Sequence, residues 1–181
     1  MIETARLVLR PPGPGDREAL VAILSDPAVM ADLFPGQDRA GAEASLARHD
    51  GYRGEGLGFL ALERREDGAI IGFCGLKPGA PNSPIAGMVE AGWITGQAWW
   101  GQGYAQEAMA AVIDDAWDWL DADRIVAITS AVNEKSQKLM VRLGMHRLAD
   151  GDYLTTLFPD GHRLQPTVTF AIQRPADRAR A

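Results

Sequence analysis

Apolar and polar residues alternate in several short segments of the chain, a pattern with a period of two that is typical of β-strands with one buried face. These segments predict about seven strands, at 6–10, 58–64, 69–76, 88–95, 124–129, 145–149 and 166–174. In the segment 88–95, one face carries Val89, Ala91 and Trp93 and the other carries Met88, Glu90, Gly92 and Ile94. The carboxylate of Glu90 lies on an otherwise apolar face, beside a glycine that leaves space to be filled.

Apolar residues recur every three to four positions in other segments, which predicts amphipathic helices. The longest helix is expected at 103–120, with further helices at 39–52 and 133–143. Asp16 is expected to N-cap a helix over the residues that follow it, and a short helical piece should start at Asp26-Pro27. The order of elements predicts one mixed sheet with helices on both faces, an α/β fold of the α+β kind.

Composition and charge narrow the class of protein. The chain has 181 residues and no linker or repeat, so we expect one domain at 1–174 and a frayed tail at 175–181. A net charge of −6 argues against general nucleic-acid binding. Three scattered histidines and one cysteine, Cys74, show no metal-ligand spacing, so no metal site is expected. No apolar run approaches ~18 residues, so no membrane span is expected, and we infer a cytoplasmic location.

A glycine-rich turn precedes the longest helix and carries Gly96, Gly101 and Gly103. Between Trp99 and Tyr104 there is no Ser, Thr, Asp or Asn to cap the helix. The first backbone N–H groups, together with the positive end of the helix dipole, would therefore suit an anion, and we interpret 101–105 as a phosphate cradle. An equally weighted alternative is an ordinary glycine-rich turn whose helix start is capped by water.

Two nucleotide-binding motifs do not fit this turn. A P-loop requires Lys and then Ser or Thr after its last glycine, whereas Tyr104 and Ala105 follow Gly103. A dinucleotide fingerprint that begins at Gly101 requires a third glycine at the position of Gln106. A nucleotide-binding oxidoreductase is therefore disfavoured.

Several segments together resemble the GNAT N-acetyltransferase superfamily, in particular its RimJ/RimL-like branch. The resemblance covers most of the chain and rests on segments that occur in the order and at the spacing of that branch: TARLVLRPP, SDPAVM, IGFCGL, VEAGWIT, WWGQGYAQEA and NEKSQKLMVRLGM. It implies a GNAT-like sheet whose fourth and fifth strands splay apart. Two residues depart from the family pattern: Trp100 stands where a Gln or Arg is usual, and Met140 stands where many members have a proton-donating Tyr.

The resemblance implies transfer of an acetyl group from acetyl-CoA to a primary amine, by direct attack in a ternary complex. It implies that Glu90 is the general base and that Ser136 protonates the leaving thiolate. The residues expected to contact the cosubstrate are Trp93, Ile94, Thr95, Gly101, Gln102, Gly103, Tyr104, Ala105, Asn133 and Ser136.

Alternatives remain open for each role. Glu90 would also be explained by a structural ion pair with a nearby Arg, and Asn133 and Ser136 by an ordinary helix N-cap. The whole chain would also be explained by a non-catalytic acyl-CoA-binding module. The acceptor is expected to be a protein N-terminus or a small-molecule amine, and the family resemblance is compatible with a homodimer.

Overall fold

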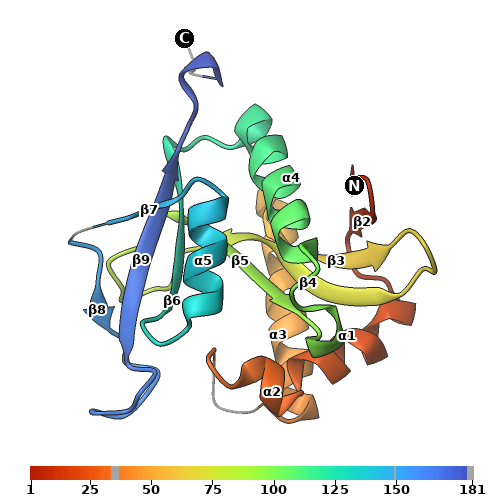
Figure 1. The fold of residues 1–181 in the computed structure, drawn as a ribbon, viewed down its shortest axis with the longest axis horizontal. Coiled ribbons are helices and arrows are strands. Elements are labelled where there is room, and N and C mark those ends of the chain that lie inside the picture. Colours follow the sequence, from red (N-terminus) through yellow and green to blue (C-terminus); the bar gives the residue numbers. More distant parts are fainter. Residues whose placement is uncertain (34–36, 149, 179–181) are drawn as a thin grey trace.

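The computed structural model describes residues 1–33, 37–148 and 150–178, and within them the strands form one sheet (Figure 1). The strands are β1 (Ile2–Glu3), β2 (Leu7–Arg10), β3 (Gly58–Arg64), β4 (Ile70–Pro78), β5 (Val89–Thr95), β6 (Arg124–Ser130), β7 (His146–Arg147), β8 (Tyr153–Leu154) and β9 (Pro166–Gln173). The α-helices are α1 (Arg17–Leu24), α2 (Pro27–Met30), α3 (Arg39–Gly51), α4 (Tyr104–Trp119) and α5 (Glu134–Arg142). Short 3-10 helices are η1 (Pro14–Asp16), η2 (Tyr52–Glu55), η3 (Gln97–Trp99) and η4 (Ala176–Arg178).

The mixed sheet predicted from the alternating segments is confirmed, and every expected strand is present. The sheet order is β1-β2-β3-β4-β5-β6-β9-β7, with β8 also paired to β9. β1 and β8 were not predicted, because two residues are too few to show an alternation. Of the expected strand at 145–149, β7 comprises two residues, and residue 149 lies outside the described part of the chain.

The sheet parts between β5 and β6. β5 is antiparallel to β4 over its whole length, from Val89 opposite Pro78 to Thr95 opposite Gly72. Its parallel pairing with β6 has one register pair, Glu90 opposite Val126. The two strands therefore separate beyond Glu90, as expected for the splayed pair.

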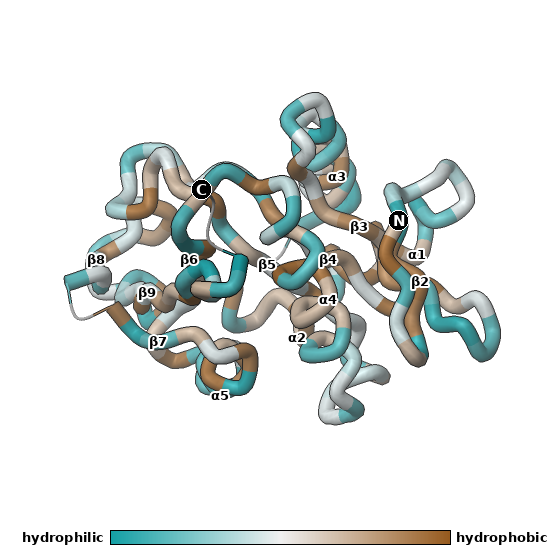
Figure 2. The backbone as a smooth tube through the Cα atoms, turned by 90° about the horizontal axis from the view of Figure 1, so that it is seen from above, coloured by the Kyte–Doolittle hydropathy of each residue, from teal (hydrophilic) through white to brown (hydrophobic). Residues whose placement is uncertain are grey.

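Two hydrophobic clusters cover the two faces of the sheet. On one face the buried residues of α4, such as Met109 and Ile113, pack with Leu62, Ile71 and Ala91 of the sheet. On the other face, α1 and α3 pack against Phe59, Ala61 and Phe73. Figure 2 shows hydrophobic residues concentrated along the central strands and hydrophilic ones along the outer turns of α3. Glu90 lies on the α1/α3 face, because Ala91, its neighbour in β5, packs toward α4.

Two local expectations turned out differently. Asp16 does not cap α1 with its side chain; it accepts hydrogen bonds from the Gly13 backbone at 2.6 Å and from Arg10 at 2.6 and 2.9 Å. In the tail expected to fray, 176–178 form η4, where the Arg178 guanidinium pairs with Asp114 and Asp118 of α4 at 2.9 and 2.7 Å. Residues 179–181 lie outside the described part of the chain.

The space beside Glu90 left by Gly92 is filled by an aromatic ring. A Cβ added at Gly92 would lie 2.5 Å from Cζ of Phe59, closer than any ordinary carbon–carbon contact. Phe59 is itself buried and packed edge-on against Phe73, with 5.3 Å between ring centroids. It has no open space into which to move.

Replacing Gly92 with alanine should therefore destabilise the fold by about 1–3 kcal/mol, the usual range for overpacking a core. Urea unfolding followed by circular dichroism measures this difference. Gly51→Ala, at the end of α3, is the matched control, since a Cβ there meets nothing within 4 Å. A Gly92→Ala protein as stable as Gly51→Ala would contradict the packing described here.

Candidate active site

The helix start predicted to cradle an anion has the expected geometry. Gly103 is the N-cap residue of α4, in the left-handed conformation with φ 83°, and no side chain caps the helix. Gly101 is also left-handed, with φ 75°, and a Cβ placed there would meet nothing within 4 Å. Backbone N–H groups at the start of α4 therefore border open space, at the positive end of a sixteen-residue helix.

The guanidinium of Arg6, a residue between β1 and β2, lies beside this turn. Arg6 donates from Nη1 to the carbonyl oxygen of Gln102 at 3.0 Å, and its guanidinium lies over the Tyr104 ring at 4.3 Å. Nε of Arg6 also pairs with Glu107 of α4 at 2.6 Å. The position of Arg6 was not predicted from the sequence, because no local pattern near residue 6 indicates a contact with a turn almost a hundred residues later.

The aromatic residues around the turn have structural partners. Tyr104 is only 6% exposed and meets Trp99 edge-on, so the part of Tyr104 that faces the turn is its backbone. Nε1 of Trp100 donates to the Thr95 carbonyl oxygen at 2.9 Å. The Lys135 ammonium of α5 lies 4.2 Å from the centroid of the Trp100 ring. Trp100 thus links the end of β5 to the first turn of α5.

The edge of β5 that faces the opening carries unpaired backbone positions. Gly96 donates its N–H to the Ile71 carbonyl and Gly79 donates to the Met88 carbonyl, at 3.0 and 2.8 Å. In an antiparallel ladder, every second residue turns its backbone N–H and C=O toward the same neighbouring strand. Met88 and Gly96 face β4, so Ile94 also directs its N–H toward β4. Trp93 and Thr95 direct theirs to the other side, toward the gap. Of the three β5 residues expected to contact the cosubstrate, Trp93 and Thr95 therefore direct an N–H group toward the gap.

Glu90 lies where β5 and β6 still pair, and its side chain is buried and bound to a lysine. The residue is 5% exposed, and its Oε2 lies 2.5 Å from Nζ of Lys77, its neighbour across the β4–β5 ladder. Burial raises the pKa of the Glu90 carboxyl, while the Lys77 charge and a hydrogen bond from the Ala80 backbone oppose that rise. The two interpretations of Glu90, a desolvated base and an ion-pair partner, thus describe one arrangement, with Lys77 in place of the anticipated Arg.

Two further titratable groups lie near this pair. Tyr153 of β8 is half-buried, and burial first and the Glu90 charge second raise the pKa of its phenol. His49 of α3 is stacked on Phe59 at 3.9 Å, and burial lowers its pKa to about 3. His49 is therefore a neutral core residue and a very weak base. Tyr153 was not expected from the sequence, because its strand is too short to recognise.

Asn133 and Ser136 begin α5 as expected for an N-cap. The Asn133 side chain, nearly fully buried, accepts a hydrogen bond from the Ser136 N–H at 3.1 Å. Ser136 is half-buried on the first turn of α5. Met140, one helical turn later, is buried in the core with 1% exposure and offers no proton.

These residues converge because β5 and β6 are parallel. The carboxyl ends of parallel strands meet at one edge of a sheet, so the turn after β5 and the turn after β6 bring the starts of α4 and α5 together. The contact between Trp100 and Lys135 places both helix starts at the mouth of the splay. Glu90 lies at the position where the two strands are still paired.

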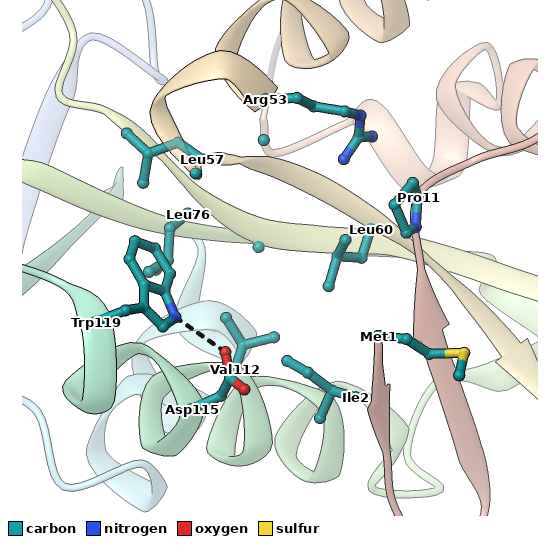
Figure 3. Close-up of a pocket in the computed structure, with 13 residues that line it drawn as sticks. Met1, Ile2, Pro11, Arg53, Leu57, Leu60, Leu76, Val112, Asp115 and Trp119 are labelled. Atoms are coloured by element: carbon teal, nitrogen blue, oxygen red, sulfur yellow. Dashed lines mark hydrogen bonds between the residues drawn. The ribbon is translucent and has the colours of Figure 1, made fainter.

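A separate hollow of about 290 Å³ lies near the other end of α4 (Figure 3). It is lined by Leu57, Leu60, Leu76, Val112 and Trp119, among others, and Figure 3 shows the Trp119 indole bonded to Asp115 at its edge. The sixteen residues of α4 span about 24 Å, so this hollow is roughly a helix length from the cradle. It includes neither Glu90 nor any residue of the cradle and lies outside the candidate site.

The described residues also bear on metal binding and on membrane insertion. Within residues 1–33, 37–148 and 150–178, no group of three or more His, Cys, Asp and Glu side chains is placed to hold a metal ion. In the same described ranges, no helix has both the length and the apolar character needed to cross a membrane.

Comparisons with known proteins agree with this geometry. The family model of the acetyltransferase (GNAT) domain matches residues 6–146, more than three quarters of the chain. An uncharacterized N-acetyltransferase, p20, of Bacillus licheniformis is 29% identical over 147 residues, which make up 80% of this chain and 81% of that protein.

Solved structures show the same fold. A GNAT-family acetyltransferase from Bacillus anthracis has a TM-score of 0.76 at 21% identity, covering 96% of this chain and 98% of that chain. A spermidine N-acetyltransferase from Vibrio cholerae, solved in complex with CoA and spermine, has a TM-score of 0.72 at 18% identity, covering 94% of this chain and 97% of that one. At these identities the likeness concerns the fold alone.

A substitution at Gly103 tests whether the start of α4 binds CoA. A Cβ there would lie 3.5 Å from Nη2 of Arg6, so a valine would add a branched side chain at the helix start, beside the cation of the cradle. We expect the affinity for CoA to fall by roughly tenfold or more, or about 1.4 kcal/mol. Isothermal titration calorimetry with CoA measures the change.

Valine at a left-handed position also strains the backbone by roughly 1–2 kcal/mol, which requires a matched control. Gly68→Val carries a comparable strain, because Gly68 has φ 73° in the turn between β3 and β4, with nothing within 4 Å of an added Cβ. If CoA bound Gly103→Val as tightly as Gly68→Val, the anion site would have to lie elsewhere.

Proposed function

This chain belongs to the GNAT acetyltransferase family, and we propose that it moves the acetyl group of acetyl-CoA to a primary amine, on a protein N-terminus or a small molecule, by direct attack in a ternary complex. The observation that carries the proposal is the uncapped, glycine-lined start of α4 at the mouth of the β5–β6 splay. We also assign the chain to the RimJ/RimL-like branch, on the segments 71–76, 89–105 and 133–145.

Binding of the cosubstrate is the first requirement. The diphosphate of acetyl-CoA would accept hydrogen bonds from backbone N–H groups in 102–105, where the helix dipole favours negative charge. Arg6 adds a positive charge at the same turn, partly balanced by Glu107. Asn133 holds the start of α5 in place on the opposite wall.

The acyl-transfer step requires a neutral amine and a donor to the oxyanion. A free α-amine has a pKa near 8 and a lysine amine near 10.4, so a base must remove a proton before or during attack. Glu90 fills this role at the apex of the splay, directly or through water, since its raised pKa makes the carboxylate a better proton acceptor. The N–H groups of Trp93 and Thr95 are the candidate donors to the oxyanion.

Departure of CoA requires a proton for the sulfur. Met140 cannot supply it, whereas Ser136 lies one turn earlier on the same face of α5 and carries a hydroxyl. Ser136 therefore gives or relays the proton to the thiolate. Its backbone N–H donates to the Asn133 side chain, so the cap fixes the position of Ser136 and the proposed role belongs to its hydroxyl.

An acceptor screen at constant acetyl-CoA tests the proposal, with N-terminal peptides, polyamines and amino acids as candidate acceptors and CoA release as the signal. With the best acceptor, Glu90→Gln should lower kcat by roughly 10²–10⁴ by removing the base. Glu63→Gln is the matched control, since Glu63 is also an ion-paired glutamate on a strand, bound to Arg10 at 2.7 Å. A loss below threefold in Glu90→Gln would exclude Glu90 as the base. CoA binding without release by any amine would favour a non-catalytic binding module.

A second variant tests the leaving-group proton. Ser136→Ala should depress kcat with little change in the affinity for acetyl-CoA, because the hydroxyl acts only as the sulfur departs. Ser136→Cys keeps a proton donor at the same position and should retain more of the turnover. Steady-state kinetics combined with calorimetry separates the two quantities. Equal kcat in wild type and Ser136→Ala would remove Ser136 from the chemistry.

A further inference from the structure

The amine of Lys77 occupies the position that an acceptor amine needs. Its Nζ lies 2.5 Å from Oε2 of Glu90, the carboxylate proposed above as the base. The contact is set by the backbone, because Lys77 and Glu90 are directly opposite each other in the β4–β5 ladder. An amine of the protein itself is therefore held at hydrogen-bonding distance from the group that would deprotonate a substrate.

The same pair marks the inner end of the opening. β5 and β6 pair at Glu90 opposite Val126 and separate beyond it. An acyl-CoA that binds with its diphosphate at 102–105 extends its pantetheine arm inward from the mouth, so its thioester reaches toward this apex. Trp93, a candidate oxyanion donor, is three residues from Glu90, about 10 Å along the strand.

The surroundings of Lys77 leave its amine reactive. Its side chain is 24% exposed, whereas that of Glu90 is 7% exposed, so Lys77 is the more accessible member of the pair. On the α3 side, His49 is neutral at pH 7 and too weak a base to compete with Glu90. The charges of Arg48 and Arg53 act on that same side, and Tyr153 approaches Glu90 from β8.

We propose that Lys77 is an internal acceptor, which this protein acetylates from its own bound acetyl-CoA. The inference rests on the proposed function. Lys77 gives a proton to the Glu90 carboxylate, and the freed nitrogen lone pair attacks the thioester carbonyl carbon. The C–N bond forms, the C–S bond breaks, and CoA leaves with the bonding electrons as a thiolate. The nitrogen, which still carries an extra proton after the attack, loses it to that thiolate, and Glu90 releases the first proton to water. The products are Nε-acetyl-Lys77 and CoA.

The modification feeds back on the site. Acetyl-Lys77 is neutral, so Glu90 loses the positive charge that favours its ionised form while remaining buried. Acetyl-Lys77 also keeps its place beside Glu90, the place that an external amine needs, so the modified protein turns over external amines more slowly. Self-acetylation thus limits the enzyme when acetyl-CoA is abundant and acceptor is scarce.

The experiment uses the full-length protein and acetyl-CoA with a deuterated acetyl group, without any added amine. Peptide mass spectrometry should find the label on Lys77, at a rate per molecule that does not change on dilution, as expected for transfer within one chain. The chain has three lysines, and the other two, Lys135 and Lys138 on α5, are exposed. They serve as internal standards for non-enzymatic acetylation, which favours exposed amines.

Variants separate this inference from the proposed function. Glu90→Gln should lower the rate of labelling at Lys77 by roughly 10²-fold or more, while Glu63→Gln should label at the wild-type rate. Label at Lys138 equal to that at Lys77, or unchanged labelling in Glu90→Gln, would overturn the inference. An unlabelled Lys77 in a protein that acetylates an added amine would also overturn it and leave the proposed function standing. Absence of both label and CoA release with every amine would refute the two together.

Discussion

The separation of two parallel strands is the constraint on which the rest of this structure depends. β5 satisfies its backbone bonds on the β4 side along its whole length, and β6 does the same with β9. Each strand can therefore leave the other after one shared register pair without unfolding the sheet. The gap leaves the outward amides of β5 at half-buried positions. Backbone N–H groups withdrawn from water need a partner, so a ligand with hydrogen-bonding groups suits this edge.

Burial gives the Lys77–Glu90 pair its chemical character. A carboxylate removed from water is held in its ionised form only by nearby positive charge and hydrogen bonds, here Lys77 and the Ala80 backbone. Any event that removes the charge of Lys77 from this contact also removes an interaction that lowers the pKa of Glu90, the proposed base. Acceptor binding and the strength of the base are thus coupled through one contact between neighbouring strands.

The sequence predicted those features that repeat along the chain or lie within one turn. Alternation located β3 to the residue and β5 to within one, and the absence of a capping side chain before Tyr104 predicted the bare start of α4. The Asn133 cap was also foreseen, since its partner is three residues away. Arg6, Lys77 and Tyr153 were not, because each reaches the site across the sheet and leaves no local signal. Asp16 occupies the N-cap position of α1 as predicted, but its carboxylate binds Arg10 and the Gly13 N–H, which the sequence did not indicate.

The two departures from the family pattern have a physical explanation within this fold. Trp100 stands where a Gln or Arg is usual, and its indole is bonded to Thr95 and covered by Lys135, so it ties the two walls of the mouth together. The cation missing from that position is matched by Arg6, which reaches the same turn from the beginning of the chain. Met140 extends the core beneath α5, where a tyrosine would bury its hydroxyl, and the nearest hydroxyl on that helix face belongs to Ser136. Under the proposed function, both roles fall to a neighbour in space, Arg6 and Ser136, which a position-by-position comparison with the family would miss.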